Sequence, residues 1–163
     1  MNDLRLRRTK NRCTIGDVKT FEPKFSEKEL KDCATQGIAA LILFGSRAQG
    51  TANEVSDIDI GVLVKNQKTL METKARSEIY DTVYALLEEK MNERTTIDIV
   101  FLDDAPAELR AHVMKYGRVL AELAPGAFTN FREKVMQEYA DFAPLRAMFH
   151  RAIQERMKSY EQQ

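Results

Sequence analysis

The chain has 163 residues, and its 25 Lys and Arg residues balance 25 Asp and Glu residues, so the formal net charge is zero. This length suits one domain of ordinary size, and the balanced charge argues against nucleic-acid binding over the whole surface. Two cysteines cannot build a disulfide framework, and no apolar run approaches the roughly 18 residues needed to span a membrane. The sequence therefore predicts a single-domain cytoplasmic protein without a membrane segment.

Residues 1–25 form the first distinct segment, which we interpret as a basic N-terminal arm. Arg and Lys dominate residues 1–12, where Asp3 is the single acid. No apolar run follows them, so the segment lacks the pattern of a secretory signal. A solvated arm or an edge strand is the plain interpretation, and an arm that binds RNA or an acidic partner is the alternative.

Residues 26–124 have the pattern of an α/β or α+β domain. Ser26 followed by Glu29 is a capping-box signature, which predicts a helix from Ser26 to about Gln36. Apolar or β-branched runs predict four strands, and the stretches between the later strands have helical spacing. The expected strands are 38–44, 57–64, 95–102 and 118–123, and the expected helices between them are 69–92 and 106–117. This order predicts a sheet of about four strands flanked by helices.

Residues 125–163 are expected to form a C-terminal helical extension. An apolar and aromatic stripe at helical spacing predicts a helix over 127–142, with Tyr139 packed in the core. Pro144 should begin or kink a last helix that continues to about Tyr160.

Three aspartates interrupt strands that are otherwise apolar. Asp57 and Asp59 are two residues apart, so their side chains project from the same face of their strand. Asp98 repeats this pattern between two isoleucines of another strand. Burying three carboxylates in a sheet is costly unless cations neutralise them. The aspartates therefore predict a cation site, unless each one lies at a strand end and faces water.

Gly45 and Ser46 stand between the buried strand 38–44 and a segment that predicts a turn with a short helical piece. Glycine lets the backbone approach a phosphate closely, and serine adds a hydroxyl donor beside free amide groups. Anion donors followed by paired carboxylates suit a magnesium-bound nucleoside triphosphate. Two metal ions about 3.5–4 Å apart could clamp the attacking and leaving oxygens. The chain contains no Walker-type phosphate loop.

The GS at 45–46 and the DID at 57–59 are separated by ten residues and resemble the GS-x10-DxD signature of the minimal nucleotidyltransferases (MNT), in the polymerase-β-like superfamily. FGSRAQGTANEVSDIDIGVLV looks like the core segment of that family, and IDIVFLD looks like the strand bearing its third carboxylate. The tail around FREKVMQEYADFAPLRAMF is similar to that of MNT antitoxins paired with HEPN toxins. The resemblance covers about residues 38–150 and implies the polymerase-β-like nucleotidyltransferase fold, with a mixed sheet.

The resemblance implies a role for each matching position. The ligands of two magnesium ions would be Asp57, Asp59 and Asp98. Asp98 would also act as the general base for the acceptor hydroxyl, or would orient that base. The triphosphate would be bound by Gly45 and Ser46, with Arg47 as a further phosphate contact. Gln49 departs from the arginine that many relatives carry, which puts one phosphate or partner contact in doubt.

The activity implied by the resemblance is transfer of AMP from ATP to a hydroxyl, with release of pyrophosphate. In the antitoxin branch that hydroxyl belongs to a tyrosine of the HEPN toxin, which predicts a hetero-oligomer of the two proteins. Two alternatives stay open. One is an aminoglycoside-type enzyme, although only residues 124–163 remain beyond the sheet to build a small-molecule pocket. The other is an antitoxin that neutralises by direct binding. Nucleic acid is expected as a partner only through the basic arm.

His112 and His150 have no partner at metal-ligand spacing. We therefore expect surface or packing roles for both histidines rather than catalytic ones.

Overall fold

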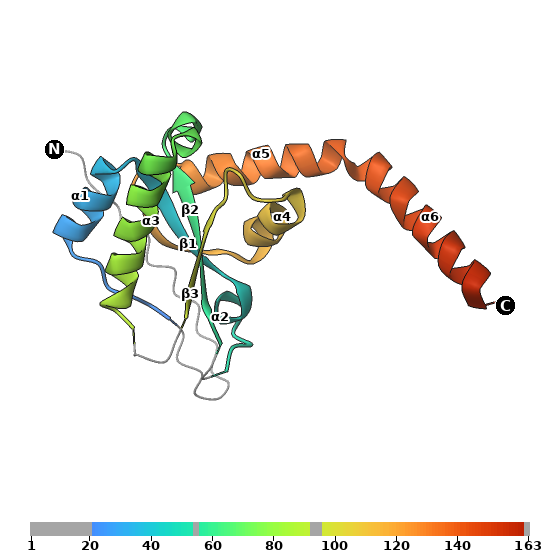
Figure 1. Cartoon of the computed structure of the whole chain (residues 1–163), viewed down its shortest axis with the longest axis horizontal. Coiled ribbons are helices and arrows are strands. Elements are labelled where there is room, and N and C mark those ends of the chain that lie inside the picture. Colours follow the sequence, from blue (N-terminus) through green and yellow to red (C-terminus); the bar gives the residue numbers. More distant parts are fainter. Residues whose placement is uncertain (1–20, 54–55, 92–95, 162–163) are drawn as a thin grey trace.

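The computed structural model describes residues 21–53, 56–91 and 96–161, so most of the predicted basic arm lies outside the described residues. Figure 1 shows a central sheet with helices on both faces and a last helix that projects away from the body. The elements in chain order are α1 (Glu27–Thr35), β1 (Ile38–Phe44), α2 (Gly45–Gln49), β2 (Ile58–Val64), η1 (Gln67–Met71), α3 (Thr73–Glu88), β3 (Ile97–Phe101), α4 (Ala107–Tyr116), β4 (Arg118–Glu122), α5 (Ala127–Asp141) and α6 (Ala143–Glu161). The predicted α+β class with a four-stranded mixed sheet and C-terminal helices is confirmed.

The sheet has the strand order β3-β2-β1-β4. β1 is antiparallel to both of its neighbours, whereas β2 and β3 are parallel. All seven residues of β1 are buried, as its uninterrupted apolar sequence predicts. The parallel pair needs a crossover, which η1 and α3 provide. The starts of β2 and β3 therefore lie at the same end of the sheet as the end of β1, where the chain enters α2.

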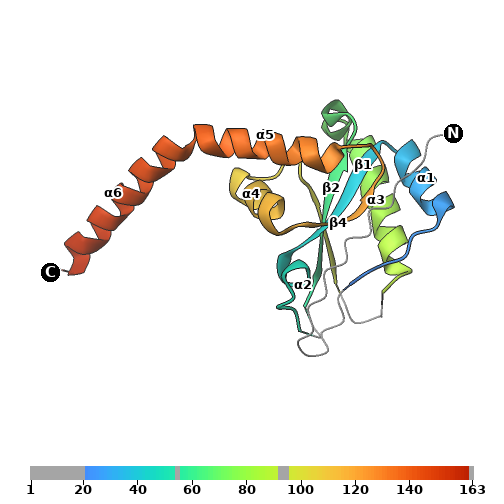
Figure 2. The ribbon, with the colours of Figure 1, turned by 180° about the vertical axis from the view of Figure 1, so that it is seen from behind.

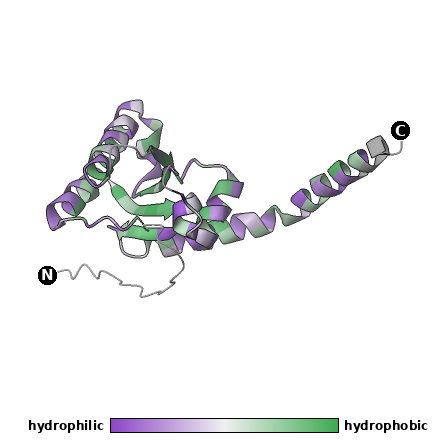
Figure 3. Cartoon of the chain, turned by 90° about the horizontal axis from the view of Figure 1, so that it is seen from below, coloured by the Kyte–Doolittle hydropathy of each residue, from purple (hydrophilic) through white to green (hydrophobic). Residues whose placement is uncertain are grey.

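Helices cover both faces of the sheet, as the two opposite views show (Figures 1 and 2). On one face, Ile60 of β2 packs in a cluster with Val83 of α3 and with Cys33 of α1. On the other face, Ile42 of β1 packs in a second cluster with Phe131 of α5 and with residues of α4. The strands are accordingly the most hydrophobic part of the chain (Figure 3). The site described below lies on the second of these faces.

The capping box predicted for α1 is present. The Ser26 hydroxyl accepts a hydrogen bond of 3.3 Å from the Glu29 amide, and the Glu29 carboxylate accepts one of 2.6 Å from the Ser26 amide. Lys90, just after α3, donates to the same carboxylate at 2.6 Å. This bond is the main cause that lowers the pKa of Glu29 to about 2. The start of α1 is thereby joined to the end of α3.

The helix predicted over 69–92 is wrong at its start, because the structure divides it into η1 and α3. The Asn66 side chain accepts a hydrogen bond from the Lys68 amide and begins η1 as a separate 3-10 turn. Glu72 then has extended backbone and interrupts the helical path. Leu70 is buried from η1 but lies nine residues before Ile79, about 180° away on an ideal helix, so its burial fits a separate turn and not one continuous helix face.

Tyr139 was expected in the core, and this is also wrong. Its side chain is 38% exposed. The Arg146 guanidinium, from the next helix, lies over its ring at 3.5 Å from the centroid. Phe131 and Val135 of the same helix are buried. The later apolar residues of α5 are exposed because this part of the helix extends beyond the sheet.

Among the helices of the described residues, none combines the length and the apolar character that crossing a lipid bilayer would require.

Leu43→Ala should lower the free energy of unfolding by about 2–5 kcal/mol, because this fully buried side chain would leave a cavity in the central strand. Val119→Ala is the control: this β4 side chain is 42% exposed, and its loss should cost less than about 1 kcal/mol. Urea unfolding followed by circular dichroism measures both values. Equal losses would contradict the assigned positions of the two side chains.

Candidate active site

The predicted carboxylates gather at one end of the sheet. Asp59 of β2 is the register partner of Asp98 in the parallel strand β3, and neighbouring strands lie about 4.8 Å apart. Each side chain points to the face where Leu63, four residues after Asp59, and Val100, two residues after Asp98, join the cluster under α4 and α5. Asp57 is exposed and comes directly before β2. The structure therefore places Asp59 and Asp98 side by side, with Asp57 next to them along the chain.

Gly45 brings the turn between β1 and α2 against Asp59. Its φ of +68° lies in the left-handed region, and an added Cβ would lie 2.0 Å from Asp59 Oδ2. The preceding residue, Phe44, is the partner of Asp59 across the β1–β2 pair. Glycine is thus required twice here, by the backbone conformation and by the space that the carboxylate occupies. The sequence pattern predicts that this glycine lets a phosphate approach, and the position of Asp59 is a second requirement for glycine.

Ser46 lies in the first turn of α2 and is half-buried. The N-cap residue Phe44 makes no side-chain capping bond, so within the described chain the start of α2 has no side-chain cap. The Ser46 carbonyl accepts a hydrogen bond of 3.0 Å from the Thr51 amide, which closes the turn after α2. The amide groups of this first turn are the donors that the sequence interpretation assigned to phosphate.

Arg47 binds the backbone of the segment that leads into β2. Its Nε donates to the carbonyls of Ser56 at 3.0 Å and Asp57 at 3.1 Å, and its Nη2 donates to Ser56 at 2.5 Å. These bonds join α2 to the start of β2 and hold the Asp57 backbone in place. In this arrangement Arg47 positions a carboxylate, and the phosphate contact stays a prediction.

The surroundings of Asp59 raise its pKa above the ordinary value. Burial is the largest cause, the negative charges of Asp98 and Asp57 add to it, and the positive charge of Arg47 opposes it. An ionised carboxylate in this place is therefore unfavourable until a positive charge joins it.

Among residues 21–53, 56–91 and 96–161, no three His, Cys, Asp or Glu side chains are arranged to hold a metal ion by themselves. Magnesium in proteins is commonly held by one or two carboxylates, while substrate phosphates and water complete its shell. The facing pair of Asp59 and Asp98, with a raised Asp59 pKa and the Gly45 turn against it, fits a site of that kind.

Sequence reasoning missed a contact beside this site. The Gln49 side-chain amide donates to the Gly45 carbonyl at 3.3 Å and lies 3.1 Å from His112 Nε2 on α4. His112 is half-buried and packs against Tyr116, with ring centroids 4.9 Å apart, so the expected packing role is confirmed. No local signal could have revealed this contact, because 63 residues separate its two members.

Comparison with known proteins found a matching family model and a related protein. The family model described as Polymerase beta, Nucleotidyltransferase matches residues 28–124, which include every predicted site residue. A Methanocaldococcus jannaschii protein, provisionally named a protein adenylyltransferase, is 32% identical over 81 residues, or 48% of this chain and 82% of the relative.

Solved structures with a similar fold include chains of toxin–antitoxin complexes. One crystal structure with AMP-PNP matches at a TM-score of 0.56 and 24% identity, over 79% of this chain and 99% of the matched chain. A variant of the MntA-HpeT complex matches at 0.56 and 25% identity, over 77% and 94%. A structure of a tri-AMPylated Shewanella oneidensis HEPN toxin with MNT antitoxin matches at 0.50 and 20% identity, over 78% and 98%.

Gly45→Ala should destabilise the protein more than Gly50→Ala. Both glycines have positive φ, which costs an alanine about 1–2 kcal/mol, but only at Gly45 does the added Cβ meet another side chain. Urea unfolding of the two variants measures the difference, and a larger loss at Gly50 would contradict the contact between Gly45 and Asp59.

Asp59→Asn should raise the free energy of unfolding at pH 7. A carboxyl group whose folded-state pKa is raised binds more protons in the folded state, so stability falls as the pH rises through that pKa. The Asp59→Asn variant does not lose stability in this way. Its gain in free energy of unfolding over the unaltered chain should disappear below about pH 3.8, the ordinary pKa of the group. Urea unfolding between pH 3 and 8 measures the effect. Asp81→Asn, on the exposed side of α3, is the control that should show no such gain.

Proposed function

The chain belongs to the polymerase beta nucleotidyltransferases, and on this basis we propose that it transfers AMP from ATP to a tyrosine hydroxyl of a HEPN toxin and so acts as an antitoxin. The observation that carries the proposal is the pairing of Asp59 with Asp98 against the Gly45 turn. The relative provisionally named a protein adenylyltransferase supports a protein acceptor. The fold shared with chains of toxin–antitoxin complexes supports the partner class.

The three carboxylates would hold two magnesium ions. When bound, these ions neutralise phosphate charge and stabilise the attacking and leaving oxygens. Asp59 is the most enclosed of the three and gains most from a cation, because burial and two like charges raise its pKa. Arg47 keeps Asp57 at the start of β2 through the two backbone carbonyls that it binds.

Gly45 and Ser46 would bind the triphosphate at the start of α2, with Arg47 as a further contact. The acceptor hydroxyl oxygen forms a bond to the α-phosphorus of ATP while the bond from that phosphorus to the bridging oxygen of the β-phosphate breaks. Pyrophosphate leaves with the electron pair, and AMP stays on the acceptor. Asp98 lies on the edge strand, is exposed, and would accept the hydroxyl proton or orient the group that does.

We also propose a division of the chain that follows the sequence boundaries. Residues 26–124 would form the nucleotidyltransferase domain, and the family match, which ends at residue 124, supports this boundary. Residues 125–163 would be a helical extension that serves the partner, and residues 1–25 a basic arm.

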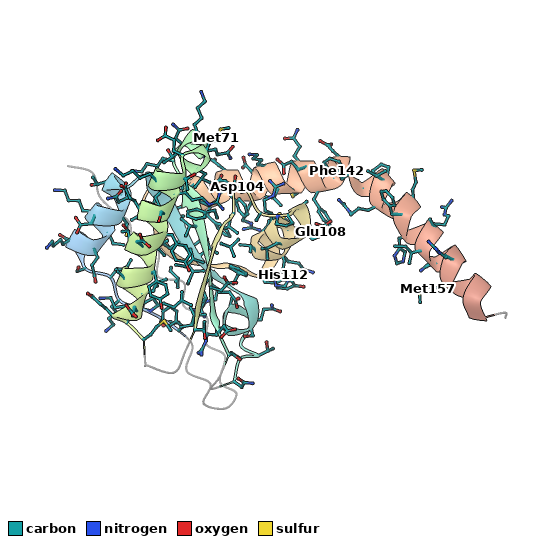
Figure 4. All side chains as sticks on the ribbon, in the orientation of Figure 1. Met71, Asp104, Glu108, His112, Phe142 and Met157 are labelled. Atoms are coloured by element: carbon teal, nitrogen blue, oxygen red, sulfur yellow. The ribbon has the colours of Figure 1, made fainter. Side chains whose placement is uncertain are left out.

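Asp98→Asn should lower AMP transfer by at least about 100-fold, because the acceptor hydroxyl loses its base. The assay uses ATP labelled at the α-phosphate, magnesium, and a HEPN-domain protein encoded in the same genome. Asp104→Asn is the matched control: it follows the same strand and lies at the opposite end of the sheet from α2 (Figure 4), so transfer should be unchanged.

Two results would contradict this function. Full neutralisation of the toxin by the variant Asp57→Ala/Asp59→Ala would assign the antitoxin effect to direct binding. Transfer of label to an aminoglycoside and not to the HEPN protein would assign a small-molecule acceptor. The intact mass of the co-expressed HEPN protein is an independent readout, since each transferred AMP adds its own mass.

A further inference from the structure

The last two helices carry a line of exposed apolar side chains, which we call the apolar stripe. Its members are 38–68% exposed and follow one another at intervals of three or four residues, apart from one adjacent pair, which is the spacing of one helix face. They are Met136, Tyr139, Phe142, Leu145, Met148, Phe149, Ile153 and Met157. The stripe begins on α5 and continues along α6, which projects away from the body (Figure 1); Phe142 lies where the two helices meet and Met157 far along α6 (Figure 4). Exposed apolar surface of this extent marks an interaction site in a soluble protein.

Part of the stripe forms one wall of a groove. The groove has a volume of about 590 Å³ and lies between α6 and the first turn of α4. Its lining residues are Glu108, Arg146, Ala147, Phe149, His150 and Ile153. Glu108 lies on the side of the body from which α6 projects (Figure 4). A partner in this groove would therefore contact both the projecting helix and the body.

α4 leads from the groove to the active site. Glu108 lines the groove, and His112, about one helical turn further along α4, contacts Gln49 of α2. Gln49 in turn binds the carbonyl of Gly45, which lies against Asp59. A protein seated in the groove thus lies beside the helix that reaches the predicted nucleotide site.

The charge of α6 indicates the chemistry of that partner. From Ala143 to Glu161 the sequence has four Arg and Lys residues and two Glu residues, so this helix is basic although the whole chain is neutral. Two copies of α6 packed on each other would bring two basic helices together, which disfavours self-association through this face. An acidic partner gains from the same charges.

Building on the proposed function, we propose that the groove and the apolar stripe dock the protein that accepts AMP, through an amphipathic helix whose apolar face is flanked by acidic residues. α6 has 19 residues and is about 28 Å long, so one partner helix of similar length could cover its part of the stripe. Phe149 and Ile153 belong to both the stripe and the groove and are the expected anchors.

The test measures docking separately from chemistry, with the HEPN-domain protein of the transfer assay as the probe. The double variant Phe149→Ser/Ile153→Ser should weaken calorimetric binding of that protein at least about 10-fold and raise its KM, while affinity for AMP-PNP stays unchanged. Met157→Ser should weaken binding, whereas Met71→Ser should not. Met71 is the matched control because it is 85% exposed on η1, far from α6 (Figure 4).

A charge variant tests the acidic character of the partner. Arg151→Glu should weaken binding, and the loss should shrink as salt is added, because screening removes the repulsion. Asp57→Ala should bind the probe as the unaltered chain does while transferring no AMP, so docking and chemistry are distinguished.

Three results would overturn the docking inference. If Phe149→Ser/Ile153→Ser left the binding affinity and the KM unchanged, the docking inference would be wrong although the transfer activity would still stand. A solution dimer that Phe149→Ser/Ile153→Ser converts to a monomer would assign the stripe to a second copy of this chain. Binding strengthened by Arg151→Glu would exclude an acidic partner. Failure of transfer by the unaltered chain would instead contradict the proposed function, and the calorimetric binding would still test docking.

Discussion

The site depends on one placement, in which two carboxylates face each other across a parallel strand pair. Asp59 and Asp98 meet because β2 and β3 pair in parallel with these two residues in register. The crossover through α3 makes that direction possible, and the missing side chain of Gly45 leaves room for the Asp59 carboxylate. Burial and the charges of Asp98 and Asp57 disfavour an ionised Asp59 in the folded protein alone, which is the electrostatic condition that a cation-bearing substrate would relieve.

Burial of apolar side chains in the core offsets the energetic cost of the half-buried Asp59 carboxylate. β1 is buried on both faces between two clusters of helix and strand residues, and it ends directly at Gly45. A fully buried inner strand of the sheet therefore holds the turn that approaches Asp59. Arg47 adds a second restraint by binding the backbone ahead of β2. The well-packed strand β1 and the Arg47 bonds thus support a carboxylate, Asp59, that is itself destabilising, as is common where proteins bind charged substrates.

Local signals in the sequence predicted most of the fold, and non-local contacts account for the rest. The capping box of α1 and the apolar run of β1 could be read directly, whereas Asp57, expected on the strand with Asp59, lies just before β2. The pairing of Asp98 with Asp59 was inferred through a family resemblance, because strand register depends on distant residues. The Gln49–His112 contact and the exposure of Tyr139 depend on how α4, α5 and α6 pack, which no periodicity in the sequence encodes.

The position of β3 at the margin of the sheet has a consequence for selectivity between acceptors. Asp98 is exposed on this outermost strand, so in the described part of the chain one side of the candidate site opens to bulk solvent. A site open on this side would admit the surface of a folded macromolecule, which a closed pocket would exclude. Under the proposed function water would also reach this site, so an acceptor that covers the bound nucleotide would limit its hydrolysis.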